Sequence, residues 1–333
     1  MANLLLTESC VRKCPYCFAK QYMEGTEDKT AISAENLIYV VDFLERSGIK
    51  QISLLGGEPL VHPKIGDFIE YLIQERKFDV RVFTSGIMAP KKLESFSEKI
   101  QRIAIDDNAK VNFIVNVNDP SISSKNELQS VYRFLSSLEK YSSLSFNIYK
   151  SDFQIDFLIE YILKFGLKRF VRFGVANPIP GLGNEYLLPD EFEKAGKNLM
   201  VGLARMYELN VHAFLDCGFP LCMFSEEDLG KLYKYTQASL RFECAPTIDI
   251  APNLECWSCF PLSQVTRKNI KDFETYVELY SYYDKLQTKY RRETNGLYRE
   301  CDSCKYFKEQ LCSGGCLAHI LNQRYLEGNF RNE

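Results

Sequence analysis

The chain lacks the features that mark several common classes of protein. Nowhere in its 333 residues does an apolar run approach the roughly 20 residues that a transmembrane helix requires. The first seven residues, MANLLLT, have no basic segment of the kind that begins a signal peptide. Lys and Arg are spread along the chain and the formal net charge is −3, which disfavours nucleic acid as a default partner. These absences predict a cytoplasmic protein that binds neither membrane nor nucleic acid.

Cysteine is absent from residues 18–216, although the chain contains 12 cysteines. Three of them lie within residues 10–17, and all the others lie within residues 217–316. A disulfide scaffold does not leave so long a segment without cysteine, and in a reducing compartment clustered cysteines are more often metal ligands. The distribution therefore predicts two metal-binding regions.

The first cysteine cluster has the spacing C-x3-C-x2-C, formed by Cys10, Cys14 and Cys17 within ESCVRKCPYCFAK. Three thiolates this close can bind three of the four irons of one cubane iron–sulfur cluster. Four-cysteine runs saturate such a cluster for electron transfer, whereas three leave one iron open to a substrate or cofactor. A zinc knuckle and a chance group of buried cysteines are the alternatives for this cluster.

A second motif, LLGGEP, follows the apolar run of residues 52–55. A strand that ends in Gly56-Gly57 presents bare backbone where a ligand can approach closely. Glu58 then offers an acceptor to an ammonium group. Alone, the motif is also consistent with an ordinary turn.

Strand and helix patterns alternate through residues 1–215, which predicts a parallel sheet with crossover helices. Ser33 is a candidate N-cap of the first helix, which Gly48 ends, and Leu37, Ile38, Val41 and Leu44 form its apolar stripe. A longer helix is predicted over Pro189–Glu208. Strands are predicted at the N-terminus and at residues 51–55, 80–84, 111–117, 144–150, 169–175 and about 211–215, which makes six or seven βα units.

The two motifs together resemble the radical S-adenosylmethionine (radical SAM) superfamily. The resemblance implies an α/β fold, an open partial (β/α)6 TIM-type barrel with its cluster at the C-terminal ends of the strands. It also implies that Cys10, Cys14 and Cys17 hold a [4Fe–4S] cluster whose open iron binds S-adenosylmethionine (AdoMet), which the reduced cluster cleaves to a 5′-deoxyadenosyl radical. Gly56, Gly57 and Glu58 would hold the AdoMet amino group. Polar residues at or near inner strand ends are further candidates for its ribose or carboxylate, although Asn there is commonly a turn former: Ser85, Asn116, Asn118, Asn147 and Arg172.

The composition changes at residue 216, so we predict a second, small cysteine-rich iron–sulfur domain over residues 216–333 after a barrel over residues 1–215. Its last four cysteines read C-x2-C-x7-C-x3-C, and Cys244-x11-Cys256 precedes them. This arrangement resembles the SPASM extension of radical SAM enzymes that modify peptides and proteins. The chain departs from that pattern in three ways: Ala251 occupies the glycine position, the third spacing is seven residues instead of five, and no cysteine follows Cys316.

The SPASM resemblance implies one or two auxiliary [4Fe–4S] clusters. Following the family, the inner cluster would use Cys222, Cys244, Cys316 and either Cys256 or Cys259, while Cys301, Cys304 and Cys312 would bind the outer one. Because the last cysteine is missing, the fourth outer ligand is open: Cys217 or Cys259 would substitute, or one iron would stay open. The alternative is a structural zinc ribbon on Cys301, Cys304, Cys312 and Cys316, which leaves the five upstream cysteines unexplained.

The function that the resemblance implies is a maturase that removes hydrogen from a residue of a ribosomally made peptide or a protein. The alternatives are a sulfatase-maturing enzyme, disfavoured because Trp257 stands where those enzymes have an acid, a small-molecule radical dehydrogenase and a non-catalytic iron–sulfur electron carrier. A nucleic-acid-modifying enzyme is less consistent with the acidic balance. No catalytic acid or base stands out among Tyr149, Asp216, His212 and Asp249.

Two kinds of partner are expected besides the substrate. An electron donor such as a reductase, flavodoxin or ferredoxin must reduce the cluster. Because Cys10 lies so near Met1, we expect leader recognition to come from a separate leader-binding protein or from the barrel itself.

Overall fold

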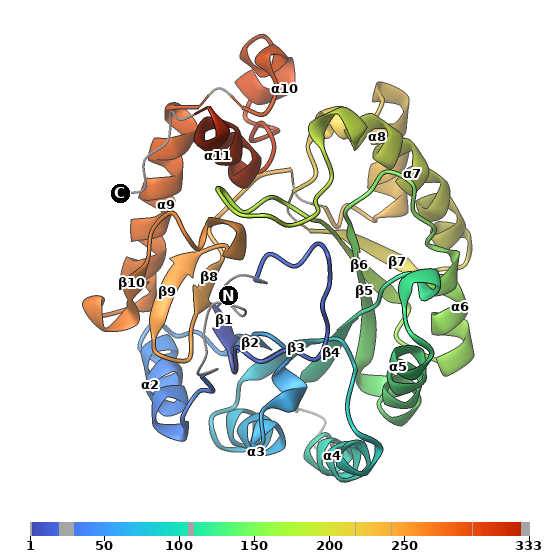
Figure 1. Cartoon of the computed structure of the whole chain (residues 1–333), viewed down its shortest axis with the longest axis vertical. Helices are drawn as coiled ribbons and strands as arrows, with labels where there is room; N and C mark the ends of the chain where they lie inside the picture. Colours follow the sequence, from blue (N-terminus) through green and yellow to red (C-terminus); the bar gives the residue numbers. More distant parts are fainter. Residues whose placement is uncertain are drawn as a thin grey trace.

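The computed structural model describes residues 2–19, 30–105, 110–216, 218–240, 242–294 and 296–327. Its strands form one curved sheet in the order β10-β9-β8-β1-β2-β3-β4-β5-β6-β7, with a ring of helices outside it (Figure 1). The strands are β1 (Ala2–Leu5), β2 (Gln51–Leu55), β3 (Asp79–Thr84), β4 (Val111–Asn116), β5 (Ser142–Ile148), β6 (Phe170–Val175), β7 (His212–Leu215), β8 (Ile248–Ile250), β9 (Glu255–Ser258) and β10 (Lys268–Asn269).

The first seven strands pair with their neighbours in parallel, which confirms the predicted parallel sheet. The strand order is linear, with β7 and β10 at its two ends, so the sheet is an open partial barrel. The cysteine-rich region continues this sheet: β8 pairs in parallel with β1, and β9 and β10 follow antiparallel. Whether residues 216–333 form a domain of their own stays a prediction.

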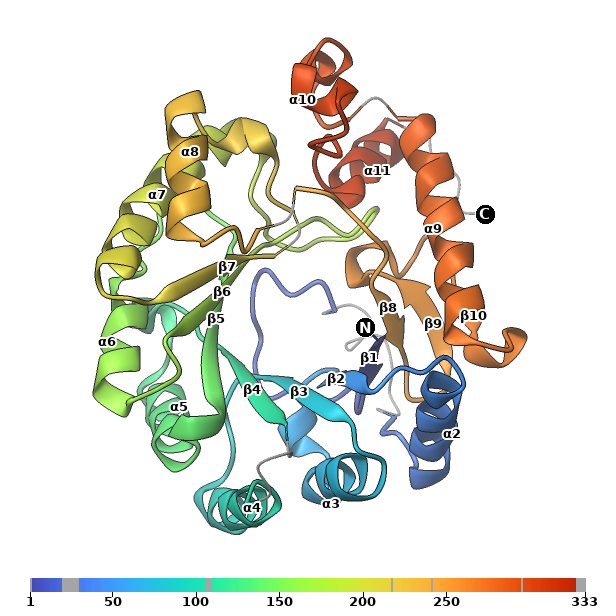
Figure 2. The same ribbon diagram turned by 180° about the vertical axis from the view of Figure 1, so that it is seen from behind.

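The crossover helices lie outside the strands, and helices of the C-terminal region fill the arc beside β8 to β10 (Figure 2). No described helix is long and apolar enough to cross a membrane. The α-helices are α2 (Ala34–Glu45), α3 (Ile65–Glu70), α4 (Pro90–Ile103), α5 (Lys125–Ser137), α6 (Asp156–Phe165), α7 (Phe192–Glu208), α8 (Glu226–Tyr235), α9 (Tyr276–Arg292), α10 (Lys305–Lys308) and α11 (Leu317–Leu326).

The first helix begins where the sequence predicts. Ser33 is the N-cap of α2, and its side chain accepts a hydrogen bond of 3.0 Å from the Asn36 amide. Leu37, Val41 and Leu44 are buried, but Ile38 is 43% exposed, so its place in the apolar stripe was wrong. Ile38 is one position past Leu37, which turns its side chain about 100° around the helix and out of the core.

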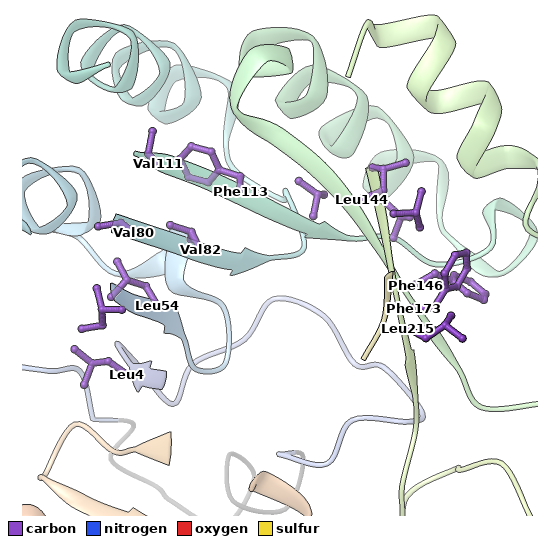
Figure 3. Close-up of a cluster of buried hydrophobic side chains, with 14 of the residues drawn as sticks. Leu4, Leu54, Val80, Val82, Val111, Phe113, Leu144, Phe146, Phe173 and Leu215 are labelled. Atoms are coloured by element: carbon purple, nitrogen blue, oxygen red, sulfur yellow. The ribbon is translucent and has the colours of Figure 1, made fainter. Parts of the chain in front are cut away.

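The hydrophobic core lies between the sheet and the surrounding helices. Alternate strand residues such as Leu4, Leu54, Val82, Phe113 and Phe173 form this layer (Figure 3). Because successive strand residues face opposite sides, the intervening residues line the inner, concave side of the sheet. Many of these are polar: Asn3, Ser53, Arg81, Asn112, Asn116, Ser143, Ser145, Asn147 and Arg172. The barrel therefore has an apolar outer layer and a polar interior.

Candidate active site

The cysteine loop that follows β1 crosses the open end of the barrel (Figure 1, dark blue). Cys10, Cys14 and Cys17 are each partly exposed on it. The far side of the loop is held by the Glu185 amide, which donates to the Pro15 carbonyl at 2.9 Å. The three thiols therefore lie at the C-terminal ends of the parallel strands, where α/β barrels place their chemistry.

Gly56 and Gly57 hold the beginning of this loop. The Gly57 amide donates to the Thr7 carbonyl at 2.8 Å, and the Glu58 amide donates to the Ser9 carbonyl at 2.7 Å. A Cβ on Gly56 would lie 2.4 Å from the Thr7 oxygen, and a Cβ on Gly57 would lie 2.1 Å from the Ser9 oxygen. The sequence predicted that bare backbone admits a ligand, whereas here it admits the backbone of the cysteine loop. The contact of both glycines with AdoMet stays a prediction.

The Glu58 carboxylate is buried and already surrounded by donors of the protein. It accepts from Thr84 Oγ1 at 2.5 Å, from the Ser85 amide at 2.7 Å, from Ser85 Oγ and from the Leu60 amide at 3.1 Å. Burial raises the pKa of Glu58, and these hydrogen bonds oppose the rise. Glu58 and Ser85 thus tie the end of β2 to the end of β3, and a direct bond from either to AdoMet stays a prediction.

The three predicted asparagines meet beneath the cysteine loop. Asn147 Nδ2 donates to Asn116 Oδ1 at 3.0 Å, and Asn116 Nδ2 donates to the Tyr16 hydroxyl at 2.9 Å. Tyr16 in turn donates to Asn118 Oδ1 at 2.6 Å. The structure therefore brings Asn116, Asn118 and Asn147 together, and Tyr16 links them to the loop between Cys14 and Cys17.

Arg12 anchors the same loop to β4 and α5. Its Nη1 donates to the Asn116 carbonyl at 2.7 Å, and its Nη2 lies 2.7 Å from Glu127 Oε1, with both side chains largely buried. Reasoning from the sequence missed both Arg12 and Tyr16. A partial signal was available, because Arg12, Lys13 and Tyr16 are the residues within the motif that carry long polar side chains, but the sequence does not show which of them reach a neighbouring strand.

Arg172 lies deeper in the interior and pairs with a residue that the sequence also singled out. Its Nε donates to Asp216 Oδ2 at 2.8 Å, and its Nη1 donates to Ser145 Oγ at 3.1 Å. Gly174 lies beside it, and a Cβ there would come within 2.8 Å of Asn147 Oδ1. Arg172 is thus within the polar interior below the asparagines, and its predicted contact with the AdoMet carboxylate stays a prediction.

The donors around Cys10, Cys14 and Cys17 fit an iron–sulfur cluster. Burial raises the pKa of the Cys10 and Cys14 thiols, while the positive charge of Arg12 and hydrogen bonds from Tyr16 and Asn118 lower that of Cys14. The Arg12 amide donates to Cys10 Sγ at 3.4 Å. Hydrogen bonds to ligating sulfurs tune the potential of such clusters. These surroundings suit an iron–sulfur cluster, and the role of Cys10, Cys14 and Cys17 as its ligands stays a prediction.

The cysteines after residue 216 form two groups. Burial, together with the neighbouring Cys312, Cys301 and Cys304, raises the pKa of Cys222 to about 12. Burial likewise raises the pKa values of Cys259 and Cys316 to about 12, with Cys244 as the next contributor to both. Cys244, Cys259 and Cys316 line one cavity, together with Asn177 and residues of the loops around them. This division separates Cys316 from Cys301, Cys304 and Cys312, so the four predicted zinc-ribbon ligands do not form one group.

Cys256 belongs to neither group. It is fully buried in the main hydrophobic core, whereas its neighbour in the C-x2-C pair, Cys259, faces the cavity. Cys217 lies outside the described residues. Among the described residues, no three His, Cys, Asp or Glu side chains lie close enough to hold a single metal ion. A cubane places its thiolates on separate irons and requires a wider arrangement.

The remaining titratable candidates are placed as follows. Asp249 lies on β8, is 3% exposed, and accepts from Asn3 Nδ2 on β1 at 2.8 Å. Burial raises the pKa of Asp249 to about 7, and hydrogen bonds from Asn3, Trp257 and the Phe260 backbone oppose this rise. His212 bonds to Ser239 at 2.9 Å near the other edge of the sheet, away from the cysteine loop. The Tyr149 ring packs on Tyr16 with centroids 5.0 Å apart, so Tyr149 does lie at the open end of the barrel.

Comparison with known proteins extends the motif evidence. Residues 4–106 match the family model described as the Radical SAM superfamily. A probable GTP 3′,8-cyclase of Methanococcus maripaludis is 28% identical over 120 residues, which is 35% of this chain. The chain matches only 37% of the length of that relative.

Solved structures match over much more of the chain. Streptococcus suis SuiB bound to S-adenosylmethionine has a TM-score of 0.64 at 17% identity, covering 95% of this chain and 73% of SuiB. Native anSMEcpe with bound AdoMet has a TM-score of 0.65 at 17% identity, covering 99% of this chain and 96% of anSMEcpe. The expected fold, a partial barrel with a cysteine-rich C-terminal region, is confirmed. Residues 4–106 are thus similar to the Radical SAM superfamily, and the chain as a whole shares its fold with SuiB and anSMEcpe.

Proposed function

We propose that this chain is a radical SAM enzyme that removes a hydrogen atom from a side chain of a peptide or protein, leading to a cross-link or an oxidised residue. Cys10, Cys14 and Cys17 would hold a [4Fe–4S] cluster. When bound and reduced, that cluster supplies the electron that cleaves AdoMet to methionine and a 5′-deoxyadenosyl radical. An external reductase, flavodoxin or ferredoxin would provide the electron, and one or two auxiliary [4Fe–4S] clusters would lie in the C-terminal region.

One observation carries the proposal: three thiols are held across the mouth of a barrel whose interior is polar. Tyr16 and Arg12 fix the loop on the ends of β4 and on α5, so the open iron would face the interior. There Asn147 and the ion pair of Arg172 with Asp216 offer polar groups to AdoMet. Gly174 leaves room above that ion pair, since a Cβ would collide with Asn147.

A peptide as the substrate is supported by the fold. SuiB has been solved with its precursor peptide SuiA, at a TM-score of 0.60, and anSMEcpe has been solved with AdoMet and a Cp18Cys peptide, at 0.64. Both similarities include the cysteine-rich C-terminal region, since they cover 95% and 99% of this chain. The matches to these sequence relatives cover only about a third of the chain.

A GTP cyclase is the second candidate, because the sequence relatives are GTP 3′,8-cyclases. A nucleoside triphosphate requires cationic side chains for its phosphates. Arg12 and Arg172, which both reach the interior near the cysteine loop, are already paired with Glu127 and Asp216. This pairing favours a substrate with less negative charge.

The test measures 5′-deoxyadenosine from the anaerobically reconstituted full chain with AdoMet and dithionite. We expect a library of synthetic peptides to increase 5′-deoxyadenosine formation and to yield peptides that have lost two hydrogens, detected by mass spectrometry. GTP should do neither. A cyclised GTP product, with no response to peptides, would contradict the proposed substrate and favour the second candidate.

A further inference from the structure

We propose that Cys222, Cys301, Cys304 and Cys312 form the complete ligand set of the outer auxiliary cluster, that Cys244, Cys259 and Cys316 belong to the inner one, and that Cys256 binds neither. This inference rests on the proposed function, because it takes both groups to hold [4Fe–4S] clusters. It differs from the family-based partition in moving Cys222 to the outer set, and it decides between the two alternatives that the partition left open, Cys256 and Cys259, in favour of Cys259.

The outer set is assembled by contacts between α8 and α10. Cys222 lies in a short 3-10 turn, Leu221–Met223, that leads into α8, and Cys304 is the N-cap residue of α10. Glu226, at the start of α8, accepts from Lys305 Nζ at 3.0 Å and from the Tyr306 hydroxyl at 2.8 Å. These two bonds hold the turn that carries Cys222 against the beginning of α10.

The other two outer cysteines reach the same place through backbone bonds. The Cys304 amide donates to the Cys301 carbonyl at 3.1 Å, so these two residues share one turn. The Cys312 amide donates to the Tyr306 carbonyl at 3.2 Å, which folds the chain back over α10. Cys222 interacts electrostatically with Cys312, Cys301 and Cys304, so the four side chains lie near one another. Cys222 thus occupies the position left by the missing last cysteine of the SPASM pattern.

The inner set surrounds the cavity described above, and Cys259 reaches it through an unusual backbone conformation. Cys259 has φ 61° and ψ 132°, a region that non-glycine residues rarely adopt. Such strain persists only where surrounding structure enforces it, and it concentrates at functional sites. The Cys259 amide is fixed to the Thr247 carbonyl at 2.7 Å, and the turn directs the thiol into the cavity with Cys244 and Cys316.

Asn177 adds a polar group to the same cavity. It is 7% exposed, its Nδ2 donates to the Val175 carbonyl at 3.0 Å, and its Oδ1 has no partner in the described structure. A buried acceptor without a donor costs free energy unless a ligand or water satisfies it. This marks the cavity as a site built for an occupant.

Cys256 is excluded by the alternation of β9. Trp257 packs with Leu5, Cys10 and Cys17, so its neighbour Cys256 faces the opposite side. There Cys256 belongs to the core cluster that includes Tyr276, Leu279 and Tyr283 of α9. It is fully buried, and its carbonyl accepts from the Tyr283 hydroxyl at 2.8 Å. An iron–sulfur ligand at this position would have to open the hydrophobic core.

The experiment counts iron and acid-labile sulfide and records EPR spectra of the full chain after anaerobic reconstitution. The wild type should hold about twelve irons, and the C301A/C304A double variant about eight, because each cubane contains four. Adding C222A to that double variant should change neither the iron content nor the EPR signals that remain. Adding C222A to a C244A/C316A double variant, which lacks the inner cluster, should alter or remove the outer signal. C256A alone should keep all iron and both auxiliary signals.

Two results would overturn the partition. One is a further loss of iron when C222A is added to C301A/C304A, since Cys222 would then hold the inner cluster. The other is a loss of about four irons in both C256A and C256V. The C256V variant refills the space that Cys256 occupies in the core, so a cavity would not explain its loss of iron. Circular dichroism and retention of the four irons bound by Cys10, Cys14 and Cys17 exclude unfolding as the cause. A wild type with about four irons and bound zinc would instead contradict the auxiliary clusters of the proposed function itself, and the partition with them.

Discussion

The two cysteine regions of this protein bring their thiols together by different means. Cys10, Cys14 and Cys17 lie on one loop, so their spacing along the chain is enough to place them together. The outer and inner groups of the C-terminal region combine cysteines as far apart as Cys222 and Cys312, or Cys244 and Cys316. A local motif therefore predicts a metal site from the sequence, whereas cysteines far apart in the chain are grouped only by the contacts of the fold.

The surroundings of the two regions differ as well. The N-terminal loop is held by polar side chains, above all Arg12 and Tyr16, that also approach the thiols. Cys259 and Cys316 instead line a cavity, and burial raises their pKa values to about 12. Because ligands must be deprotonated, metal binding there must displace protons that the buried thiols hold firmly. The two regions thus differ in the polar side chains around their thiols, although both contain partly exposed cysteines.

The largest effect is expected from replacing Cys10, Cys14 and Cys17 with Ala. This triple variant should form no 5′-deoxyadenosine from AdoMet, because the open iron that binds AdoMet would be lost. It should lose about four irons and keep those of the C-terminal region. Iron analysis and chromatography of the products check both statements. If the triple variant still cleaves AdoMet, the cluster that binds AdoMet is not held by Cys10, Cys14 and Cys17.

Gly57→Ala tests whether the glycines position the cysteine loop. The added Cβ would lie 2.1 Å from the Ser9 carbonyl oxygen, a backbone atom that cannot rotate away. We expect a displaced loop, lower iron occupancy at Cys10, Cys14 and Cys17, and AdoMet cleavage reduced by roughly 100-fold, as for other misplaced catalytic groups. Gly183→Ala is the control, since its Cβ would meet nothing within 4 Å. Full iron and activity in Gly57→Ala would refute the positioning role.

Asp249→Asn tests the contact between β1 and β8, where the C-terminal region joins the barrel. Burial raises the pKa of Asp249 to about 7, whereas an aspartate in the unfolded chain titrates near its usual value of about 3.9. The folded state therefore keeps a proton that the unfolded state has lost. The contribution of the protonated Asp249 to the unfolding free energy is fully present below about pH 4 and is lost as the pH rises to about 7.

In urea unfolding of the metal-free protein at pH 4.5 and 7.5, the wild type should lose a few kcal/mol of unfolding free energy at the higher pH, since each pKa unit corresponds to about 1.4 kcal/mol. Asp249→Asn should show a smaller loss, and the exposed Asp152→Asn should behave as the wild type. An equal pH dependence of the unfolding free energy in the wild type and in Asp249→Asn would mean that Asp249 is ionised in the folded protein.

The smallest effect is expected from Tyr16→Phe. The variant removes the hydroxyl that donates to Asn118 Oδ1 and accepts from Asn116 Nδ2, so each of these two atoms loses this hydrogen bond. The expected cost is about 1–3 kcal/mol of unfolding free energy, with a several-fold lower rate of AdoMet cleavage and unchanged iron in the C-terminal region. Tyr233→Phe, whose residue is 50% exposed, is the control. A change in the auxiliary EPR signals of Tyr16→Phe would show that the two regions are coupled.

The sequence by itself determined the parallel sheet and the N-terminal cysteine site. Alternating apolar residues and helix caps such as Ser33 act over a few positions, and the spacing of Cys10, Cys14 and Cys17 is equally local. The prediction made for Gly56 and Gly57 was incomplete, because neighbouring positions in the sequence do not show which group packs against the glycine backbone. Here that partner is the chain at Thr7 and Ser9, some fifty residues earlier.

Only the tertiary structure decided how the C-terminal cysteines are grouped. Cys256 and Cys259 have the spacing of a ligand pair, but strand alternation buries Cys256 in the core, and a left-handed turn directs Cys259 into the cavity. Cys222 joins Cys301, Cys304 and Cys312 because Glu226 ties α8 to α10. The physical reason is one of range: spacing fixes geometry over a few residues, and beyond that distance the packing of helices against the sheet decides which thiols meet.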